Sequence, residues 1–270
     1  MKKVCPLKDE PPPGVSIYDK EEYAIYELDG EDHKVCTPWT KSSILYGPTL
    51  TRNEHQLYCQ NLSLFAKLFL ETKSVFFDSS TFLYYTLVLR DPQRQQPQVV
   101  GFFSKEKMSW DNNNIACILI FPPWQKRGLG QILIAASYEL GRREGRFGGP
   151  ERPLSKMGRK GYVAYWCGEV ARCILGAPGK KQLSVREISE ATFILPEDVA
   201  TAVREMEVCE TARKTAGGSV VVKKERVRAW AERHGVGLEP LVDGEAFTKV
   251  YEEFGSESEG DESMGESSDG

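Results

Sequence analysis

Alternation of apolar and polar positions predicts β-strands in the first part of the chain. Residues 22–28 alternate in this way and end at the turn Asp29-Gly30, so we expect a small N-terminal β element. Residues 74–77, 82–89 and 98–103 are three further strand-like runs. We expect these three runs to form an antiparallel meander.

A continuous apolar run, residues 115–121, is typical of a strand buried on both faces. It stops at Pro122-Pro123, which predicts a central strand followed by a break. A long helix is expected from Gly128. Its apolar stripe consists of Leu129, Ile132, Leu133, Ala136 and Leu140. Arg142 and Arg143 fall in its final turns, where cations suit the helix dipole.

Helical spacing predicts the remaining elements. The segment 57–70 forms an amphipathic helix with one apolar side made of Leu62, Phe65, Leu68 and Phe69. A further helical pattern covers 162–175. Ser184-Val185-Arg186-Glu187 is a capping-box signature, and Leu195-Pro196-Glu197-Asp198 marks another helix start. A short strand at 220–222 and a helix at 225–234 complete a winged-helix-like order.

The composition is that of an ordinary soluble globular protein. The chain has 270 residues, of which 40% are hydrophobic and 27% charged, as expected for one or two domains. No stretch approaches the roughly 20 consecutive apolar residues needed to cross a bilayer, and Met1–Pro6 lacks the apolar core of a leader. Secretion and membrane insertion are not expected.

The cysteines and histidines do not form a metal-binding pattern. There are seven cysteines and three histidines, and no two cysteines have the two-residue spacing of a zinc knuckle. We expect reduced thiols in a cytosolic or nuclear compartment, and no metal.

The acidic charge is concentrated at the C-terminus. Residues 255–270 carry six acidic and no basic residues, while the net charge of the whole chain is −4. We expect this tail to be disordered. A solubilising end is favoured over a segment that contacts basic partners.

The candidate chemistry lies in the loop Gln125-Lys126-Arg127-Gly128-Leu129-Gly130, which opens the long helix. Glycines at a helix N-terminus present free backbone N–H groups and the positive end of the dipole, which suit a pyrophosphate. The same residues could form only a surface turn. The spacings of nucleotide P-loops and dinucleotide folds are absent. The pattern that fits is Gln/Arg-x-x-Gly-x-Gly/Ala, the coenzyme A loop of acetyltransferases with the GNAT-type fold.

Further runs make the chain resemble the catalytic core of the MYST family of histone acetyltransferases over about residues 57–235. These runs are 101–107, 110–114, 116–119, 122–123, 137–140 and 149–155. The resemblance implies an α/β (α+β) fold: a GNAT-like core with a mixed, mainly antiparallel sheet, flanking helices and a helical, winged-helix-like C-terminal part. The expected domains are a β region with an insertion (1–56), an acetyl-CoA-binding core (57–180), a helical subdomain (181–254) and the tail.

The resemblance also implies roles for single residues. Glu151 matches the general base, Cys117 the active-site cysteine and Lys73 the autoacetylated lysine. The implied acetyl-CoA contacts are Ile118, Ile120, Gln125, Lys126, Arg127, Gly128, Leu129, Gly130, Gln131 and Ser155.

The chemistry of lysine acetylation needs these residue types. A lysine ammonium has a pKa near 10.4 and cannot attack a thioester until it loses a proton, so a carboxylate base is required. Glu151 supplies that base, unless it is a solvated loop glutamate. Cys117 is either a covalent acetyl carrier or a small apolar residue beside coenzyme A. We favour direct transfer, with Cys117 auxiliary.

Three features depart from the family. Met1–Leu7 resembles only the end of a zinc finger, so Cys5 is left alone and zinc is not predicted. Residues 36–56 are an insertion; it is a surface loop or, as a hypothesis, a translated intron that a spliced transcript would lack. Ile120 and Gln131 replace a usual threonine and lysine, which should weaken coenzyme binding by about 1 kcal/mol or somewhat more.

The sequence therefore predicts a nuclear histone acetyltransferase that uses acetyl-CoA, acts on histone tails and nucleosomes and works with chromatin-complex subunits. Two alternatives stay open: an acetyltransferase for non-histone proteins or small amines, and an inactive structural subunit. Direct DNA contact through the basic residues at 223–228 is a third, less favoured, interpretation.

Overall fold

The computed structural model describes residues 11–31, 52–70, 78–90, 97–177, 183–208, 222 and 224–248. Several sequence predictions lie outside these residues. They concern Cys5, most of the insertion at 36–56, Lys73, the strand at 74–77 and the tail at 255–270.

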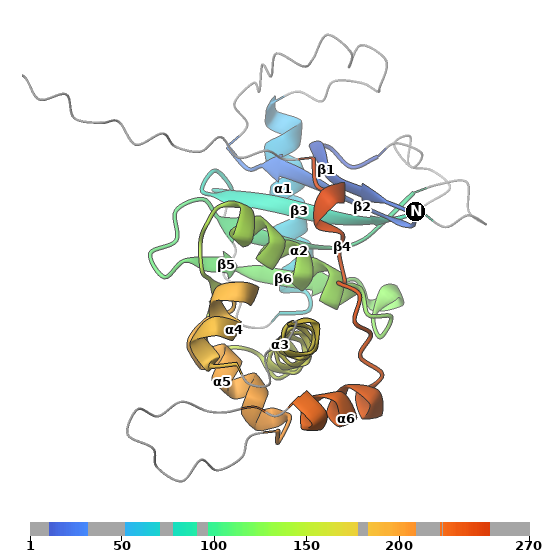
Figure 1. Ribbon diagram of the computed structural model, residues 1–270. Coiled ribbons are helices and arrows are strands. Elements are labelled where there is room, and N and C mark those ends of the chain that lie inside the picture. Colours follow the sequence, from blue (N-terminus) through green and yellow to red (C-terminus); the bar gives the residue numbers. More distant parts are fainter. Residues whose placement is uncertain are drawn as a thin grey trace, which may run out of the picture.

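A five-stranded antiparallel sheet forms the upper half of the molecule (Figure 1). Its strands, in spatial order, are β1 (Val15–Lys20), β2 (Tyr23–Asp29), β3 (Phe82–Leu89), β4 (Gln98–Glu106) and β6 (Cys117–Ile120). Each pairs antiparallel with its neighbour. The predicted N-terminal β element and the pairing of 82–89 with 98–103 are confirmed.

The sequence predicted that the apolar run 115–121 forms one central strand, and this prediction was wrong. The run is divided at Ala116 into β5 (Asn113–Ile115) and β6. β5 pairs parallel with the short strand β7 (Gly149–Pro150), whereas β6 is the edge of the large sheet. Ala116 lies at the switch, and its N–H donates to the Ser104 carbonyl at 2.8 Å. An apolar run alone cannot tell an edge strand from a central one.

Helices cover both faces of the sheet and form the lower half of the molecule (Figure 1). They are α1 (Arg52–Lys67), α2 (Leu129–Arg143), α3 (Lys156–Gly176), α4 (Val185–Thr192), α5 (Pro196–Glu205) and α6 (Lys224–His234), with short 3-10 turns η2 (Pro122–Trp124) and η3 (Gly244–Ala246). α1 packs on the face that carries Tyr84, and α2 on the face that carries Tyr85. None of the helices in the described ranges is long and apolar enough to cross a membrane.

The sequence assigned the wrong face of α1 to the core. Of the predicted apolar side only Leu62 is buried, whereas Phe65 and Leu68 are 41% and 72% exposed. The sheet instead contacts the small residues Cys59 and Ala66. Phe65 lies at the border of this contact, with its ring centroid 5.0 Å from that of Phe121, so the buried stripe of α1 is offset from its largest apolar residues.

The C-terminal helices surround α3, as Figure 1 shows. The predicted capping box at Ser184 and the helix start at Pro196 are confirmed. α3 begins six residues earlier than the pattern at 162 indicated, because the Ser155 side chain caps it by accepting from the Gly158 N–H. Only Val222 of the predicted strand 220–222 is described. The domain boundary at 180 stays a prediction.

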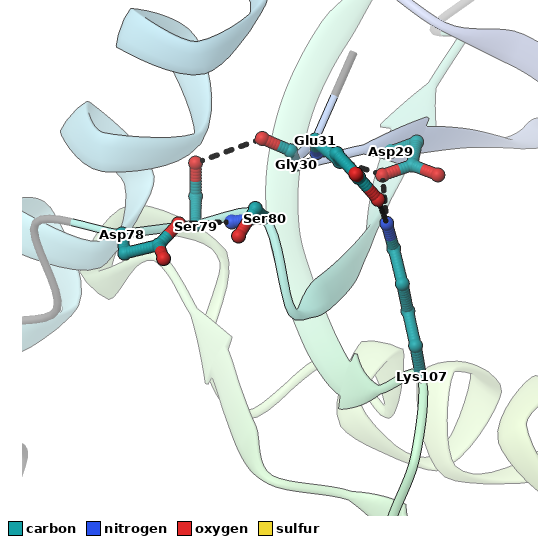
Figure 2. A network of polar contacts seen from close by, with 7 residues as sticks. All are labelled: Asp29, Gly30, Glu31, Asp78, Ser79, Ser80 and Lys107. Carbon is teal, nitrogen blue, oxygen red and sulfur yellow. Dashed lines mark hydrogen bonds and ion pairs between the residues drawn. The ribbon is translucent and has the colours of Figure 1, made fainter. Parts of the chain in front are cut away.

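A polar corner fixes the sheet where the chain leaves β4 (Figure 2). The Lys107 ammonium, directly after β4, lies 2.7 Å from the Asp29 carboxylate and 2.9 Å from that of Glu31. The Ser79 hydroxyl donates to the Gly30 carbonyl at 3.1 Å. These contacts hold together the ends of β2, β3 and β4 at the point from which the chain runs into β5.

Candidate functional site

The candidate site lies where β6 and β7 diverge. β5 and β7 run side by side, and the Glu151 N–H continues their ladder by donating to the Ile115 carbonyl at 3.0 Å. After Ile115 and the single residue Ala116, the chain pairs with β4 as strand β6. The other edge of β6 therefore has no strand partner in the part of the chain that the structure describes.

The open edge of β6 presents the backbone of Ile118 and Ile120. Hydrogen-bonded residues alternate along an antiparallel pair, and the Phe121 N–H donates to Val100 on β4. The polar groups of Ile118 and Ile120 therefore point away from β4. The Ile120 carbonyl accepts from the Gln125 side-chain amide at 2.9 Å, which ties the next loop to this edge.

The glycine loop joins β6 to α2. Lys126 and Gly128 have left-handed backbone conformations, with φ of 62° and 78°. Gly128 is the N-cap of α2 and offers no side chain to the first-turn N–H groups, and that turn contains no acidic residue. Free N–H groups, the helix dipole and the exposed side chains of Lys126 and Arg127 are features that suit an anion.

Neighbouring contacts fix this loop from both sides. The Arg127 guanidinium lies 5.0 Å from the centroid of the Trp124 ring. Gln131 donates from its side-chain amide to the Gly161 carbonyl of α3 at 2.8 Å, so it joins α2 to α3. Leu129 is buried in the core beneath the loop. A Cβ on Gly130 would lie 3.8 Å from the Ile120 side chain, so the loop approaches the β6 edge closely.

Glu151 and Ser155 lie on the segment between β7 and α3. Glu151 is exposed, and its carboxylate makes no ion pair or hydrogen bond with the residues described in the structure. Ser155 caps α3, which directs its hydroxyl oxygen to the Gly158 N–H at 3.0 Å. The hydroxyl hydrogen can still be donated to a ligand.

Cys117 lies on the α1 side of β6. Its side chain is 7% exposed and belongs to an apolar cluster with Cys59, Tyr84 and Leu119. Ile118 and Ile120 pack instead against the larger core on the α2 side. Strand alternation therefore places Cys117 and the two isoleucines on opposite faces.

A buried polar group beneath Glu151 escaped the sequence analysis. Asp198, in the first turn of α5, is 1% exposed and accepts from Arg152, the residue after Glu151. Burial raises the pKa of Asp198, and the Arg152 guanidinium opposes that rise. Asp198 reads in sequence only as an acid at a helix start, so no local signal indicated its burial.

Trp166 and Tyr138 extend this polar group into the core. The Trp166 indole N–H donates to the Tyr138 hydroxyl at 2.8 Å. Burial raises the pKa of Tyr138, which keeps the phenol protonated. Within the described ranges, no group of three His, Cys, Asp or Glu side chains could hold a metal ion.

Comparison with known proteins identifies the family. Residues 49–242 match the model of the MOZ/SAS family. The chain is 39% identical over 197 residues to histone acetyltransferase MOF of Drosophila melanogaster, covering 73% of this chain and 21% of that protein. It is 36% identical over 199 residues to human histone acetyltransferase KAT6A, covering 74% of this chain and 9% of that protein.

The human histone acetyltransferase KAT6B is 35% identical over 216 residues, covering 80% of this chain and 9% of that protein. The chain thus spans about a fifth or less of the length of these relatives. The family match covers most of the chain and includes β3 to β7, the open edge of β6 and the glycine loop. The chain belongs to the MOZ/SAS family, that is, to the MYST proteins.

Proposed function

We propose that this chain is a protein lysine acetyltransferase that transfers acetyl from acetyl-CoA to histone-tail lysines, with Glu151 as the general base. One observation carries the proposal: the open edge of β6 leads from Glu151 to the glycine loop. Glu151 is bonded to Ile115 at one end, and Gln125 to Ile120 at the other. Ile115 and Ile120 are five positions apart, on β5 and β6, and a chain extended over that number of residues spans roughly 16 Å, which suits an extended arm.

The residues at both ends of this edge fit acetyl-CoA. At the glycine loop, first-turn N–H groups of α2 with Lys126 and Arg127 would bind the diphosphate. Along β6, the backbone of Ile118 and Ile120 would hydrogen-bond the amide-bearing arm. The Ser155 hydroxyl at the start of α3 would donate one further bond. Acetyl-CoA supplies the acetyl group as a reactive thioester.

Glu151 performs the proton transfer in this proposal. Its exposed carboxylate accepts a proton from the lysine ammonium, and the neutral amine then attacks the acetyl carbonyl. Backbone N–H groups on the open edge of β6 stabilise the negative charge that develops on the carbonyl oxygen. The C–S bond of the thioester then breaks, the departing coenzyme A thiolate takes up the second proton from the nitrogen, and Glu151 releases the first proton to solvent. The burial of Cys117 among apolar side chains supports direct transfer over an acetyl-cysteine intermediate.

The acceptor is inferred from the relatives, which are named histone acetyltransferases. An exposed base suits a flexible, extended tail. With that substrate we propose a nuclear location, work on nucleosomes within a chromatin complex, and autoacetylation at Lys73.

Replacing Glu151 by Gln tests the proposal. The parent protein should acetylate a histone-tail peptide, and E151Q should lower kcat about 100-fold or more with the acetyl-CoA Kd within about threefold of the parent. The matched control is E190Q, an exposed glutamate of α4 paired with Arg186, which should retain parent activity. Radiolabel transfer and calorimetry measure these quantities.

Two outcomes would contradict the proposal. An E151Q protein as fast as the parent across neutral and alkaline buffers removes Glu151 from the mechanism. Failure of the parent chain to bind acetyl-CoA in the calorimeter points instead to an inactive structural subunit. Mass spectrometry of nucleosomes incubated with the parent then identifies the lysines modified.

A further inference from the structure

The residue next to Glu151 is anchored to a buried carboxylate on α5. Arg152 donates to one carboxylate oxygen of Asp198, whose side chain is only 2% exposed, whereas the Arg152 side chain is 53% exposed. An acid at a helix start normally faces solvent, where it complements the dipole without desolvation. Asp198 therefore has a buried position that the needs of α5 alone do not explain.

Asp198 lies against the Glu151 segment at two residues, Gly149 and Arg152. A Cβ built on Gly149, two residues before Glu151, would lie 3.3 Å from the second Asp198 carboxylate oxygen. That oxygen is buried and accepts no hydrogen bond from the described residues. Arg152, on the other side of Glu151, also lies over the Trp166 ring, with its guanidinium 6.0 Å from the ring centroid. Trp166 is in turn held by Tyr138.

The Glu151 backbone is thus held on both sides. Its own N–H is bonded to Ile115, and the next side chain is drawn down to Asp198. A buried carboxylate demands its cation, because an unpaired buried charge is strongly unfavourable. Arg152 consequently has little freedom, and neither has the backbone that links it to Glu151.

We propose that Asp198 is a positioning residue: through Arg152 it fixes the segment after β7 so that the Glu151 carboxylate faces the acceptor amine. The inference rests on the proposed function. The Arg152–Asp198 contact also links α5 to the segment that follows β7. A displacement of about 1 Å at a catalytic group can cost roughly 100-fold in rate.

The test uses the full chain with D198N, which keeps the shape of the side chain and removes its charge, and with R152K, which keeps the charge and removes the planar fork. The matched control is E205Q on the same helix, which breaks the exposed Arg159–Glu205 ion pair of 2.5 Å. Each protein is assayed for acetyl-CoA Kd, kcat, KM and thermal unfolding.

A second acceptor separates positioning from stability. It is a histone-tail peptide in which thialysine, whose amine has a lower pKa, replaces the target lysine. An amine that loses its proton more readily depends less on the base. We expect D198N and R152K to lower kcat with lysine about 10- to 100-fold, and with thialysine several-fold less, with acetyl-CoA Kd within about twofold. E205Q should behave as the parent.

Each other outcome overturns a distinct statement. Equal losses with both acceptors, in proportion to the unfolded fraction, would reduce Asp198 to a structural role. If D198N does not fold, R152K decides, and unchanged kcat in R152K refutes positioning. If E151Q itself is as active as the parent, the proposed function fails. If E151Q is slow while D198N and R152K are fast, the positioning inference alone fails.

Discussion

Cys117 is surrounded by apolar and aromatic side chains on the α1 face of the sheet, including Tyr84 and Leu119. Such surroundings suit a small packed residue better than a thiolate. We expect Cys117→Ser to retain acetyl transfer within about tenfold of the parent and to bind acetyl-CoA normally, as measured by steady-state kinetics and calorimetry. A variant that binds acetyl-CoA as the parent does but transfers no acetyl would establish a covalent acetyl-cysteine.

The burial of Cys167, on α3, can be tested by measuring how the labelling rate of its thiol depends on pH. Its thiol donates to the Ala202 carbonyl at 3.6 Å, and burial raises its pKa to about 12. At pH 8 only about one thiol in ten thousand is then ionised, so iodoacetamide should label Cys167 slowly, with a rate that rises about tenfold per pH unit up to pH 10. Peptide mass spectrometry follows the label.

The same shift has a defined sign for stability. The folded state holds the Cys167 proton more tightly than the unfolded state, so the contribution is complete below about pH 8.5 and declines as pH rises toward 12. Urea titrations at several alkaline pH values measure it. Rapid labelling at pH 8 in native buffer, at the rate of the denatured control, would show that α3 and α5 do not pack as described.

The site residues differ in how far the sequence could indicate them. Glu151 and the glycine loop each belong to a short sequence motif, and the order of residues in that motif was enough to indicate them. Asp198 has no such signal, because its burial depends on α5 meeting α3 and β7, and those contacts join residues about fifty positions apart. Side chains that act through tertiary contacts escape local motifs.

At the scale of elements, two effects of Gly128 at the N-terminus of α2 can be measured separately: its effect on backbone strain and its effect on ligand binding. Gly128 and Gly145 both have left-handed φ values, 78° and 64°, and a Cβ at either would meet no atom within 4 Å. Gly128→Ala and Gly145→Ala should therefore lower the free energy of unfolding equally, by about 1 kcal/mol. Urea unfolding measures this effect.

Only the glycine in the loop should affect the ligand. Gly128 precedes α2 in the candidate diphosphate site, whereas Gly145 follows α2 at its other end. We expect Gly128→Ala to weaken acetyl-CoA binding about three- to tenfold, as the backbone N–H groups shift, and Gly145→Ala to leave it unchanged. Equal Kd values for both variants would remove the loop from the binding site.

Element prediction succeeded where the signal is local. The signals at Ser184 and Pro196 each depend on a few residues that are close in the sequence, and α4 and α5 begin at these positions. The predictions for the run 115–121 and for the buried face of α1 were wrong, because residues far away in the sequence determine both. β5 (113–115) pairs with β7 and not with the large sheet, and the buried cluster under α1 includes Cys59 and Ala66 but not Phe65.

At the scale of the molecule, one buried core joins the sheet to the C-terminal helices. Ile25 and Leu87 of the sheet belong to the same cluster as Ile188 and Val199 of α4 and α5. The chain then returns from α6 to β1 (Figure 1). There the centroid of the Phe247 ring lies 4.8 Å from that of the Tyr18 ring. The sequence predicted a domain boundary at residue 180. Composition and periodicity could not indicate that the chain returns from α6 to β1.

A continuous core should unfold cooperatively. Ile188 is fully buried, so Ile188→Ala should lower the free energy of unfolding by about 2–5 kcal/mol. Because α4 shares its core with the sheet, we expect one calorimetric transition that moves as a whole to lower temperature, by roughly 4–20 °C. Two transitions, of which only one moves, would instead establish that residues 181–254 form a separate domain. In that case the Arg152–Asp198 contact would join two domains, and the acetyl transfer rate should depend on how tightly they dock.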